Sequence, residues 1–229
     1  VKIYSKGDDY ISTQVYWKGY KGYEGATVHL FYHLAKKSNC IFDVGANVGL
    51  FTLIAGCANR KSAIYSFEPV PMILERLKRN ATINHLSTVK AELLAVGSAD
   101  GNISFFVPDQ EGIPFSSSAA KGWSEKTIEI NVRSIRLDNY REKQKTGKVD
   151  LIKMDCEFHE KEVLAGMENM LAKDQPILIT EILFPESEGV KGHFENSDYI
   201  EIEKILLKHG YYFYLINATA LSRVDRLEY

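Results

Sequence analysis

Short apolar runs alternate with longer segments of helical periodicity along most of the chain. Five runs have the continuous apolar character of strands buried on both faces of a parallel sheet, and they are residues 40–44, 63–67, 89–96, 149–154 and 176–182. Apolar residues recur at helical spacing in residues 27–37, 48–58, 72–84, 161–172 and 199–208. Strands that alternate with helices predict an α/β protein with a doubly wound, mostly parallel sheet.

The alternation is interrupted once and ends on two further strands. Residues 102–107 and 127–132 predict a small β-hairpin insertion, and residues 211–216 and 221–227 bring the predicted main sheet to seven strands. A chain of 229 residues fits one α/β domain. Within residues 1–229 we expect an N-terminal approach and helix over 1–38, irregular or short-stranded up to residue 25, and the doubly wound core over 39–229.

The amino-acid composition indicates which partners to expect and in which compartment the protein works. The net charge of -2 gives no general attraction to nucleic acid or to an anionic membrane, so we expect no nucleic-acid partner. No apolar run reaches the roughly 18 residues of a membrane span. The three cysteines are odd in number and form no CxxC pair, which favours reduced thiols and a cytoplasmic location.

The turn after the first strand is the clearest sign of a ligand site. It contains Asp43, Gly45, Asn47 and Gly49, at the point where a doubly wound sheet opens onto its ligand crevice. Gly45 allows a tight turn close to a ligand, and Gly49 allows close packing of the following helix. Asn47 stands where a dinucleotide fingerprint has its second glycine, so a smaller ligand with an ammonium and a carboxylate fits better than a pyrophosphate. No GxxxxGK motif is present, which excludes a P-loop.

An acidic residue lies at the end of the next predicted strand. Glu68 follows Gly49 by 19 residues and precedes Pro69, which matches the acidic residue that binds ribose hydroxyls about 20 residues beyond the glycine turn. Each feature alone has a structural explanation, since an Asp can cap a helix, a Gly can turn the chain and a Glu can be a solvated strand end. Their combination at this spacing favours an adenosine-containing ligand.

Further short stretches complete a pattern that covers most of the chain. They are Ala95-Val96-Gly97, Leu137-Asp138, Asp150-Leu151-Ile152-Lys153-Met154-Asp155-Cys156-Glu157 and Thr180-Glu181. Together with the glycine turn and Phe67-Glu68-Pro69 they resemble the FkbM family of methyltransferases. The resemblance implies a class I, Rossmann-like fold, S-adenosylmethionine as cofactor, and O-methylation of a hydroxyl on a sugar, glycan or secondary metabolite. This chain has Phe158-His159-Glu160 where the family usually has Gly-Ala-Glu, so we expect the adjacent substrate pocket to differ.

The resemblance also implies roles for individual residues. The methionine part of the cofactor would contact Asp43, Gly45 and Asn47, with Ala46 and Gly49 in the same turn. The ribose would lie at Glu68 and Pro69, and the adenine at Ala95 and Val96. Asp155 would lie near the transferable methyl group. Glu24 would face the cofactor, although a surface loop explains this residue equally well.

Methyl transfer requires an aligned acceptor and a group that takes the acceptor's proton. Asp155, Glu157 and His159 alternate after the fourth strand and share one face if that strand extends so far, and Glu181 ends the adjacent strand. These four are the candidate catalytic residues. His159 could instead begin the next helix, and Glu157 could favour its N-terminus by charge. Mn or Mg ligation by the first three is a further alternative, but no metal-binding spacing supports it, and we expect no metal.

Other functions remain open at this point. An RNA or protein methyltransferase would need a basic, aromatic-lined groove, which the net charge of -2 does not indicate. A non-catalytic S-adenosylmethionine-binding domain would bind the cofactor without turnover, and Asn47 disfavours an NAD enzyme. We expect a small-molecule or glycan acceptor, because aromatic faces suit a sugar ring. Aromatics in two loops beside the crevice fit this expectation, although they could equally anchor the loops: Phe115, Trp123, Phe184 and Phe194.

Overall fold

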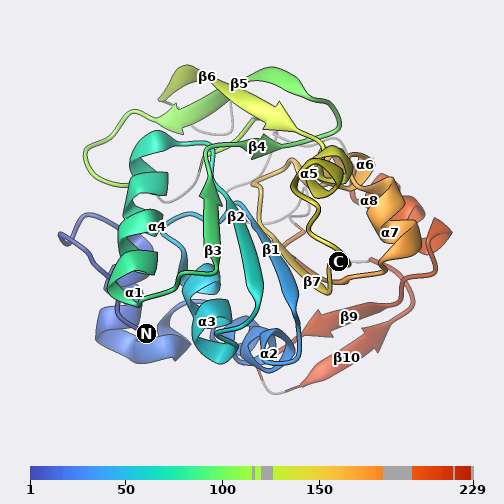
Figure 1. Ribbon diagram of the computed structural model, residues 1–229, viewed down its shortest axis with the longest axis horizontal. Coiled ribbons are helices and arrows are strands. Elements are labelled where there is room, and N and C mark those ends of the chain that lie inside the picture. Colours follow the sequence, from blue (N-terminus) through green and yellow to red (C-terminus); the bar gives the residue numbers. More distant parts are fainter. Residues whose placement is uncertain (115–116, 120–125, 183–197, 219, 228–229) are drawn as a thin grey trace.

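The computed structural model describes residues 1–114, 117–119, 126–182, 198–218 and 220–227 (Figure 1). In this part of the chain the central sheet has five parallel strands, in the order β3 (Val89–Glu92), β2 (Ala63–Phe67), β1 (Cys40–Val44), β7 (Leu151–Met154) and β8 (Ile177–Thr180). The chain proceeds outward from β1 through β2 to β3, and from β7 to β8 on the other side. The direction of winding therefore changes between β1 and β7, and such a switch point opens a crevice at the carboxyl ends of the strands. The predicted doubly wound α/β fold is confirmed.

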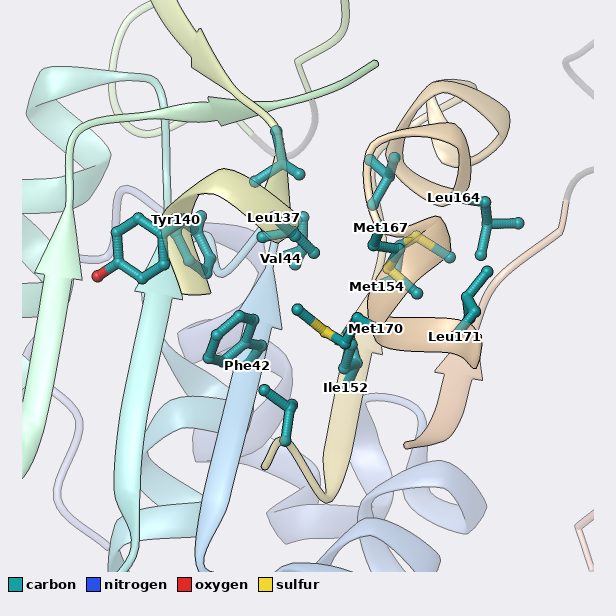
Figure 2. Close-up of a cluster of buried hydrophobic side chains, with 14 of the residues drawn as sticks. Phe42, Val44, Leu137, Tyr140, Ile152, Met154, Leu164, Met167, Met170 and Leu171 are labelled. Atoms are coloured by element: carbon teal, nitrogen blue, oxygen red, sulfur yellow. The ribbon is translucent and has the colours of Figure 1, made fainter. Parts of the chain in front are cut away.

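Helices cover both faces of this sheet. The strands share one apolar cluster with α2 (Gly25–Ala35), α3 (Leu50–Ala58) and α4 (Pro71–Ile83). They share a second cluster with α5 (Leu137–Gln144), α6 (Glu160–Ala165), α7 (Glu168–Lys173) and α8 (Asp198–Lys208). Figure 2 shows Phe42 and Ile152 from the strands close to methionine and leucine side chains of this second cluster. The result is a three-layer α/β/α arrangement.

The alternation of side chains along each strand decides which polar residues reach the crevice. Ile41 belongs to the cluster on the α3 side, whereas Phe42 and Val44 belong to the cluster on the other side. Because successive side chains point to opposite faces, Asp43 faces α3. The same alternation in β7 places Lys153 on the α3 side, and the sheet register pairs Lys153 with Asp43.

The predicted hairpin insertion is confirmed, and it recruits a third strand. β5 (Gly101–Pro108) pairs antiparallel with β6 (Thr127–Ile135), and β4 (Ala95–Val96) pairs parallel with β6. Figure 1 shows this small sheet across the end of the central sheet toward which β3 points. The prediction of one strand over residues 89–96 is wrong. The chain leaves the central sheet after Glu92, and β4 finds its hydrogen-bond partner in the hairpin.

The last two predicted strands do not join the central sheet. β9 (Phe213–Ile216) and β10 (Leu221–Val224) pair antiparallel with each other and form a separate two-stranded sheet. The seven-stranded sheet is therefore wrong for the described residues, where the central sheet has five strands. The connection between β9 and β10 is short, so their mutual pairing has a low loop-closure cost.

The N-terminal approach is helical, contrary to the prediction of irregular or short-stranded structure. α1 (Tyr10–Lys18) is followed by a 3₁₀ turn, η1 (Gly19–Gly22). Asp9 caps α1, because its Oδ1 accepts a hydrogen bond from the Ser12 amide at 2.7 Å. Arg76 of α4 forms ion pairs with Asp8 at 2.9 Å and Asp9 at 3.3 Å, which tie the start of α1 to the central fold.

The helix expected over residues 161–172 is divided into α6 and α7. Gly166 lies at the break, and a Cβ there would come within 2.1 Å of the Gly97 carbonyl oxygen. The close approach of these two backbones interrupts the helix at this position. No helix in the described part of the chain is both long and apolar enough to cross a bilayer.

Candidate active site

A pocket opens at the carboxyl ends of the central strands. Eleven of the fourteen predicted site residues line it, and these are Asp43, Gly45, Ala46, Asn47, Glu68, Pro69, Ala95, Val96, Asp155, Glu157 and His159. The remaining three, Glu24, Gly49 and Glu181, do not line it. The structure thus brings together residues from the ends of β1, β2, β4 and β7.

The glycine turn after β1 packs directly against the end of β7. Gly45 has a φ of 75°, and a Cβ on it would lie 1.8 Å from the Asp155 carbonyl oxygen. The Gly45 and Ala46 amides donate to the Phe67 carbonyl oxygen at 3.1 and 3.0 Å. Only a residue without a side chain fits there, because both the φ and the available space exclude a Cβ.

Asn47 and Gly49 continue this turn into α3 with positive φ angles of 47° and 91°. The Asn47 Oδ1 accepts from the Val48 amide at 2.7 Å, and asparagine tolerates the left-handed conformation better than most residues. A Cβ on Gly49 would lie 2.9 Å from the Leu77 side chain. Gly49 therefore permits close packing of α3 against α4, and it lies outside the pocket.

Glu68 is held at the pocket wall by two backbone donors. The Asn47 amide donates to its Oε2 at 3.0 Å and the Val70 amide to its Oε1 at 2.9 Å. Each oxygen keeps a second lone pair that can accept from a ligand hydroxyl. The side chain is buried, and burial raises the pKa of Glu68 to about 7. Pairing with ligand donors would favour the ionised form.

Asp43 is the second buried carboxylate of the pocket. The Thr52 hydroxyl of α3 donates to its Oδ2 at 2.5 Å, and Thr52 also shares a 2.7 Å hydrogen bond with Ser66. Burial raises the pKa of Asp43 to about 6, although the Thr52 hydrogen bond and the charge of Lys153 act in the opposite direction. A carboxylate in this environment favours a positively charged ligand group.

The fourth strand ends where it was predicted to end and does not extend through residues 155–159, so the condition for a shared strand face is not met. β7 ends at Met154, and Glu157 and Phe158 have φ angles of 47° and 78°, which turn the chain. The Glu160 Oε1 accepts from the Cys156 amide at 2.9 Å, and His159 is the N-cap residue of α6. Asp155, Glu157 and His159 still line one pocket because the turn, and not a strand face, directs them there.

Glu157 and His159 differ in their protonation near neutral pH. Burial raises the pKa of Glu157 to about 8, and the negative charges of Asp155, Glu181 and Glu160 raise it further. Burial lowers the pKa of His159 below its ordinary value of 6.5, against the charge of Glu162. At pH 7 the imidazole is therefore neutral and able to accept a proton, whereas the Glu157 carboxyl is largely protonated.

The two remaining acidic candidates lie beside the pocket. The Glu24 carboxylate is 3.8 Å from the Lys153 ammonium, so it faces the pocket through that lysine. Glu181 follows β8, and its negative charge raises the pKa of Glu157. The aromatic residues proposed for the loops, Phe115, Trp123, Phe184 and Phe194, lie outside the described residues.

The pocket also contains residues to which the sequence analysis gave no role. Parts of its wall are formed by Ile11 of α1, Phe51 of α3, Phe105 of β5, Ser117 and Lys153 of β7. Lys153 could have been recognised, because a lysine inside the buried run 149–154 needs charged partners. Ile11 had no such signal, since α1 itself was not predicted.

The metal alternative finds no support in the described part of the chain. Within those residues no group of three or more His, Cys, Asp or Glu side chains is arranged to hold a metal ion.

The raised pKa values of the pocket carboxyls predict how stability depends on pH. Burial of Glu157 raises its pKa from the ordinary 4.5 to about 8, and burial of Glu160 raises its pKa to about 7. Between these limits the folded chain binds more protons than the unfolded chain, so stability falls as pH rises from about 4.5 to 8. The melting temperature of the ligand-free protein, measured by calorimetry, should decrease over this range.

Glu157→Gln should flatten this decrease, whereas Glu142→Gln, at an exposed position of α5 outside the pocket, should leave it unchanged. A melting temperature that rises from pH 5 to pH 8 would contradict the assigned direction.

Comparison with known proteins gives this geometry its context. A family model described as "Methyltransferase FkbM domain" matches residues 43–213. The hexuronic acid methyltransferase AglP of Haloferax volcanii is 31% identical over 150 residues, which cover 65% of this chain and 58% of that protein. The 31-O-demethyl-FK506 methyltransferase FkbM of Streptomyces tacrolimicus is 26% identical over 160 residues, which cover 58% of this chain and 61% of that protein. The alignments therefore span less than two thirds of the length of these relatives.

A solved structure shares the fold at low sequence identity. Cofactor-bound Rv0187 from MTB matches with a TM-score of 0.50 and 10% identity, over 86% of this chain and 76% of that chain. The strand order, the glycine turn after β1 and the acidic residue after β2 together define a class I, Rossmann-like methyltransferase domain. Because the family model matches most of the sequence, the chain belongs to the FkbM methyltransferase domain family. Its cofactor is accordingly S-adenosylmethionine.

The pocket residues fit this cofactor in charge and in the space they leave. S-adenosylmethionine carries an ammonium and a sulfonium, and the buried carboxylates of Asp43 and Glu68 lie in the pocket wall. Because Gly45 has no side chain, the turn leaves space beside these carboxylates. The free lone pairs of Glu68 match the two donors of a ribose diol.

Proposed function

We propose that this domain transfers a methyl group from S-adenosylmethionine to a hydroxyl on a sugar, glycan or secondary metabolite. The observation that carries the proposal is the pocket formed by the glycine turn, Glu68 and the end of β7 in a chain of the FkbM family. The names of two relatives, a hexuronic acid methyltransferase and a 31-O-demethyl-FK506 methyltransferase, support a hydroxylated acceptor.

The cofactor residues divide by their place in the pocket. We propose that Asp43, Gly45, Ala46 and Asn47 hold the methionine part, that Glu68 and Pro69 hold the ribose, and that Ala95 and Val96 contact the adenine. Asp155 lies at the end of β7 next to the glycine turn, and we assign it to the methyl-bearing end. Gly49 contributes indirectly, by setting the position of α3 against Leu77.

The chain's own task in the reaction is alignment and proton removal. The cofactor, when bound, supplies a methyl group on a positively charged sulfur, and the acceptor oxygen must approach it in line. A hydroxyl is a poor nucleophile while it keeps its proton, so a base that is unprotonated at the working pH assists. His159 meets this condition at pH 7, and Glu157 meets it above about pH 8. Glu181 is a reserve candidate beside the pocket.

Two other functions predict different observations. An RNA methyltransferase needs a positively charged surface beside the pocket, but the described lining residues include four carboxylates and one lysine. A protein methyltransferase would turn over with a protein acceptor. A non-catalytic binding domain would bind the cofactor without turnover. The described geometry favours methyl transfer to a small acceptor over both.

The direct test combines binding with turnover. Calorimetry should show micromolar binding of S-adenosylhomocysteine and much weaker binding of NAD. Formation of S-adenosylhomocysteine should then be measured with a panel of glycans and hydroxylated metabolites, with RNA and a protein mixture as competing acceptors. Absence of S-adenosylhomocysteine binding would overturn the proposal, and binding without turnover on any acceptor would favour the non-catalytic function.

Glu68→Gln should weaken S-adenosylhomocysteine binding about 10- to 100-fold. The substitution removes the charge that accepts two ribose hydrogen bonds, and charged hydrogen bonds contribute about 1.5–3 kcal/mol each before water recovers part of that. Glu92→Gln is the matched control, because Glu92 ends the adjacent strand β3 and does not line the pocket. Equal dissociation constants for both variants would show that Glu68 does not bind the ribose.

We also propose a cytoplasmic location and one domain over residues 1–229. All three cysteines are free in the structure. Burial raises the pKa of Cys40 to about 12 and the pKa of Cys156 well above its ordinary value, so both remain unreactive thiols. Mass spectrometry of the protein isolated under alkylating conditions should find three unpaired thiols.

A further inference from the structure

Lys153 is a buried cation inside the pocket that the proposed reaction does not use. It lies on β7, next to the central strand β1, and is 2% exposed. Its ammonium lies over the Phe51 ring, 4.7 Å from the ring centroid, in the first turn of α3. Among the described residues that line the pocket it is the only lysine or arginine.

The described residues leave the ammonium incompletely bonded. An ammonium has three N–H donors. The Asp155 Oδ2 lies 3.4 Å away and the Glu24 Oε2 lies 3.8 Å away, both longer than an ordinary hydrogen bond of 2.7–3.2 Å. These long contacts use only part of the hydrogen-bonding capacity of a buried ammonium, whose desolvation is costly, and this arrangement points to a further acceptor group in the pocket.

The position of Lys153 identifies the chemistry of that acceptor. Lys153 pairs with Asp43 in the sheet register, and Asp43 belongs to the turn to which the methionine part of the cofactor is assigned. The methionine part carries one ammonium and one carboxylate. Asp43 suits the ammonium by charge, and Lys153 is the cation available for the carboxylate.

We propose that Lys153 binds the α-carboxylate of the methionine part of S-adenosylmethionine. This inference rests on the proposed cofactor assignment and adds a residue to it. Burial disfavours the charged form of Lys153, but the negative charges of Asp155, Glu24, Asp43 and Glu181 outweigh burial, so its pKa is raised and the ammonium stays charged at neutral pH. The carboxylate of the ligand adds a short charged hydrogen bond where the protein supplies only long ones.

Binding of three ligands that differ in the amino-acid part tests the proposal. The ligands are S-adenosylhomocysteine, its decarboxylated analogue, which keeps the ammonium, and 5′-methylthioadenosine, which has neither group. By calorimetry the wild-type protein should bind S-adenosylhomocysteine about 10- to 100-fold more tightly than the decarboxylated analogue, as expected for one charged hydrogen bond. Lys153→Met should abolish this preference, and binding of 5′-methylthioadenosine should change little.

Lys90→Met is the control, because Lys90 lies on β3 outside the pocket, and it should keep the full preference. If Lys153→Met does not fold, nitrogen NMR of lysine side chains in the wild-type protein replaces it. The signal of the Lys153 ammonium should then shift with S-adenosylhomocysteine and not with the decarboxylated analogue.

Each outcome separates this inference from the proposed function. Failure of all three ligands to bind would overturn the cofactor assignment itself. Equal binding of S-adenosylhomocysteine and the decarboxylated analogue by the wild-type protein would overturn the role of Lys153 alone. The role of Lys153 would also be overturned if Lys153→Met kept the preference for S-adenosylhomocysteine over the decarboxylated analogue but lost turnover. That result would indicate that the Lys153 ammonium contacts the acceptor instead.

Discussion

Gly45→Ala is expected to abolish S-adenosylhomocysteine binding and to destabilise the protein by about 2–5 kcal/mol. Two costs combine at this position. A non-glycine residue in the left-handed region costs about 1–2 kcal/mol, and Gly45 has a φ of 75°. In addition the new Cβ would lie 1.8 Å from the Asp155 carbonyl oxygen, so β7 must move, and forced overpacking of this kind costs about 1–3 kcal/mol. Denaturant unfolding measures the stability and calorimetry measures the binding.

Gly147→Ala separates the two costs. Gly147 has a similar φ of 78°, but a Cβ there meets no atom within 4 Å. It should therefore show the backbone cost alone and bind S-adenosylhomocysteine normally. If Gly45→Ala were no more destabilising than Gly147→Ala, the close contact between the glycine turn and the end of β7 would be wrong.

His159→Ala is expected to lower kcat by about 10²–10⁴-fold, the usual contribution of a general base, with the dissociation constant of S-adenosylhomocysteine nearly unchanged. A base acts mainly in the transition state, so its loss appears in turnover and not in cofactor affinity. His33→Ala, an exposed histidine of α2 outside the pocket, is the control. The measurement needs an acceptor from the screen described above.

The pH profile of wild-type turnover distinguishes the two leading candidates. Burial lowers the pKa of His159 below 6.5, so a reaction that depends on His159 should gain rate through an inflection below that pH. Dependence on Glu157 would place the inflection near pH 8, where its carboxyl ionises. Full activity of His159→Ala with an inflection near 8 would transfer the role to Glu157.

The central sheet could be predicted because its strands are buried on both faces. Such strands appear in the sequence as continuous apolar runs, and residues 63–67 coincide with β2. The glycine turn and Glu68 could also be placed, since a doubly wound sheet brings the ends of neighbouring strands to one crevice. The positions of the glycine turn and Glu68 could be predicted from the order of the strands along the chain alone.

The remaining features depend on contacts between residues distant in sequence. The apolar pattern could not show that residues 89–96 form two strands, β3 and β4. They are separate because β4 pairs with β6 of the hairpin. Positive φ angles at Glu157 and Phe158 leave no pattern in the apolar residues. The ion pair of Lys153 with Glu24 joins β7 to the start of α2, and no local periodicity indicates such a pair.

The mixed origin of the pocket wall has an evolutionary consequence. The β1, β2 and β7 ends supply the glycine turn, Glu68 and Asp155, whereas Ile11 and Phe105 come from α1 and the inserted hairpin. Loops join α1 and the hairpin to the central sheet, and loops accept substitutions and changes of length more readily than the elements they connect. Related chains can therefore change the acceptor that they recognise by changing how the N-terminal helix and the hairpin are connected. The strand ends that bind the cofactor can stay the same.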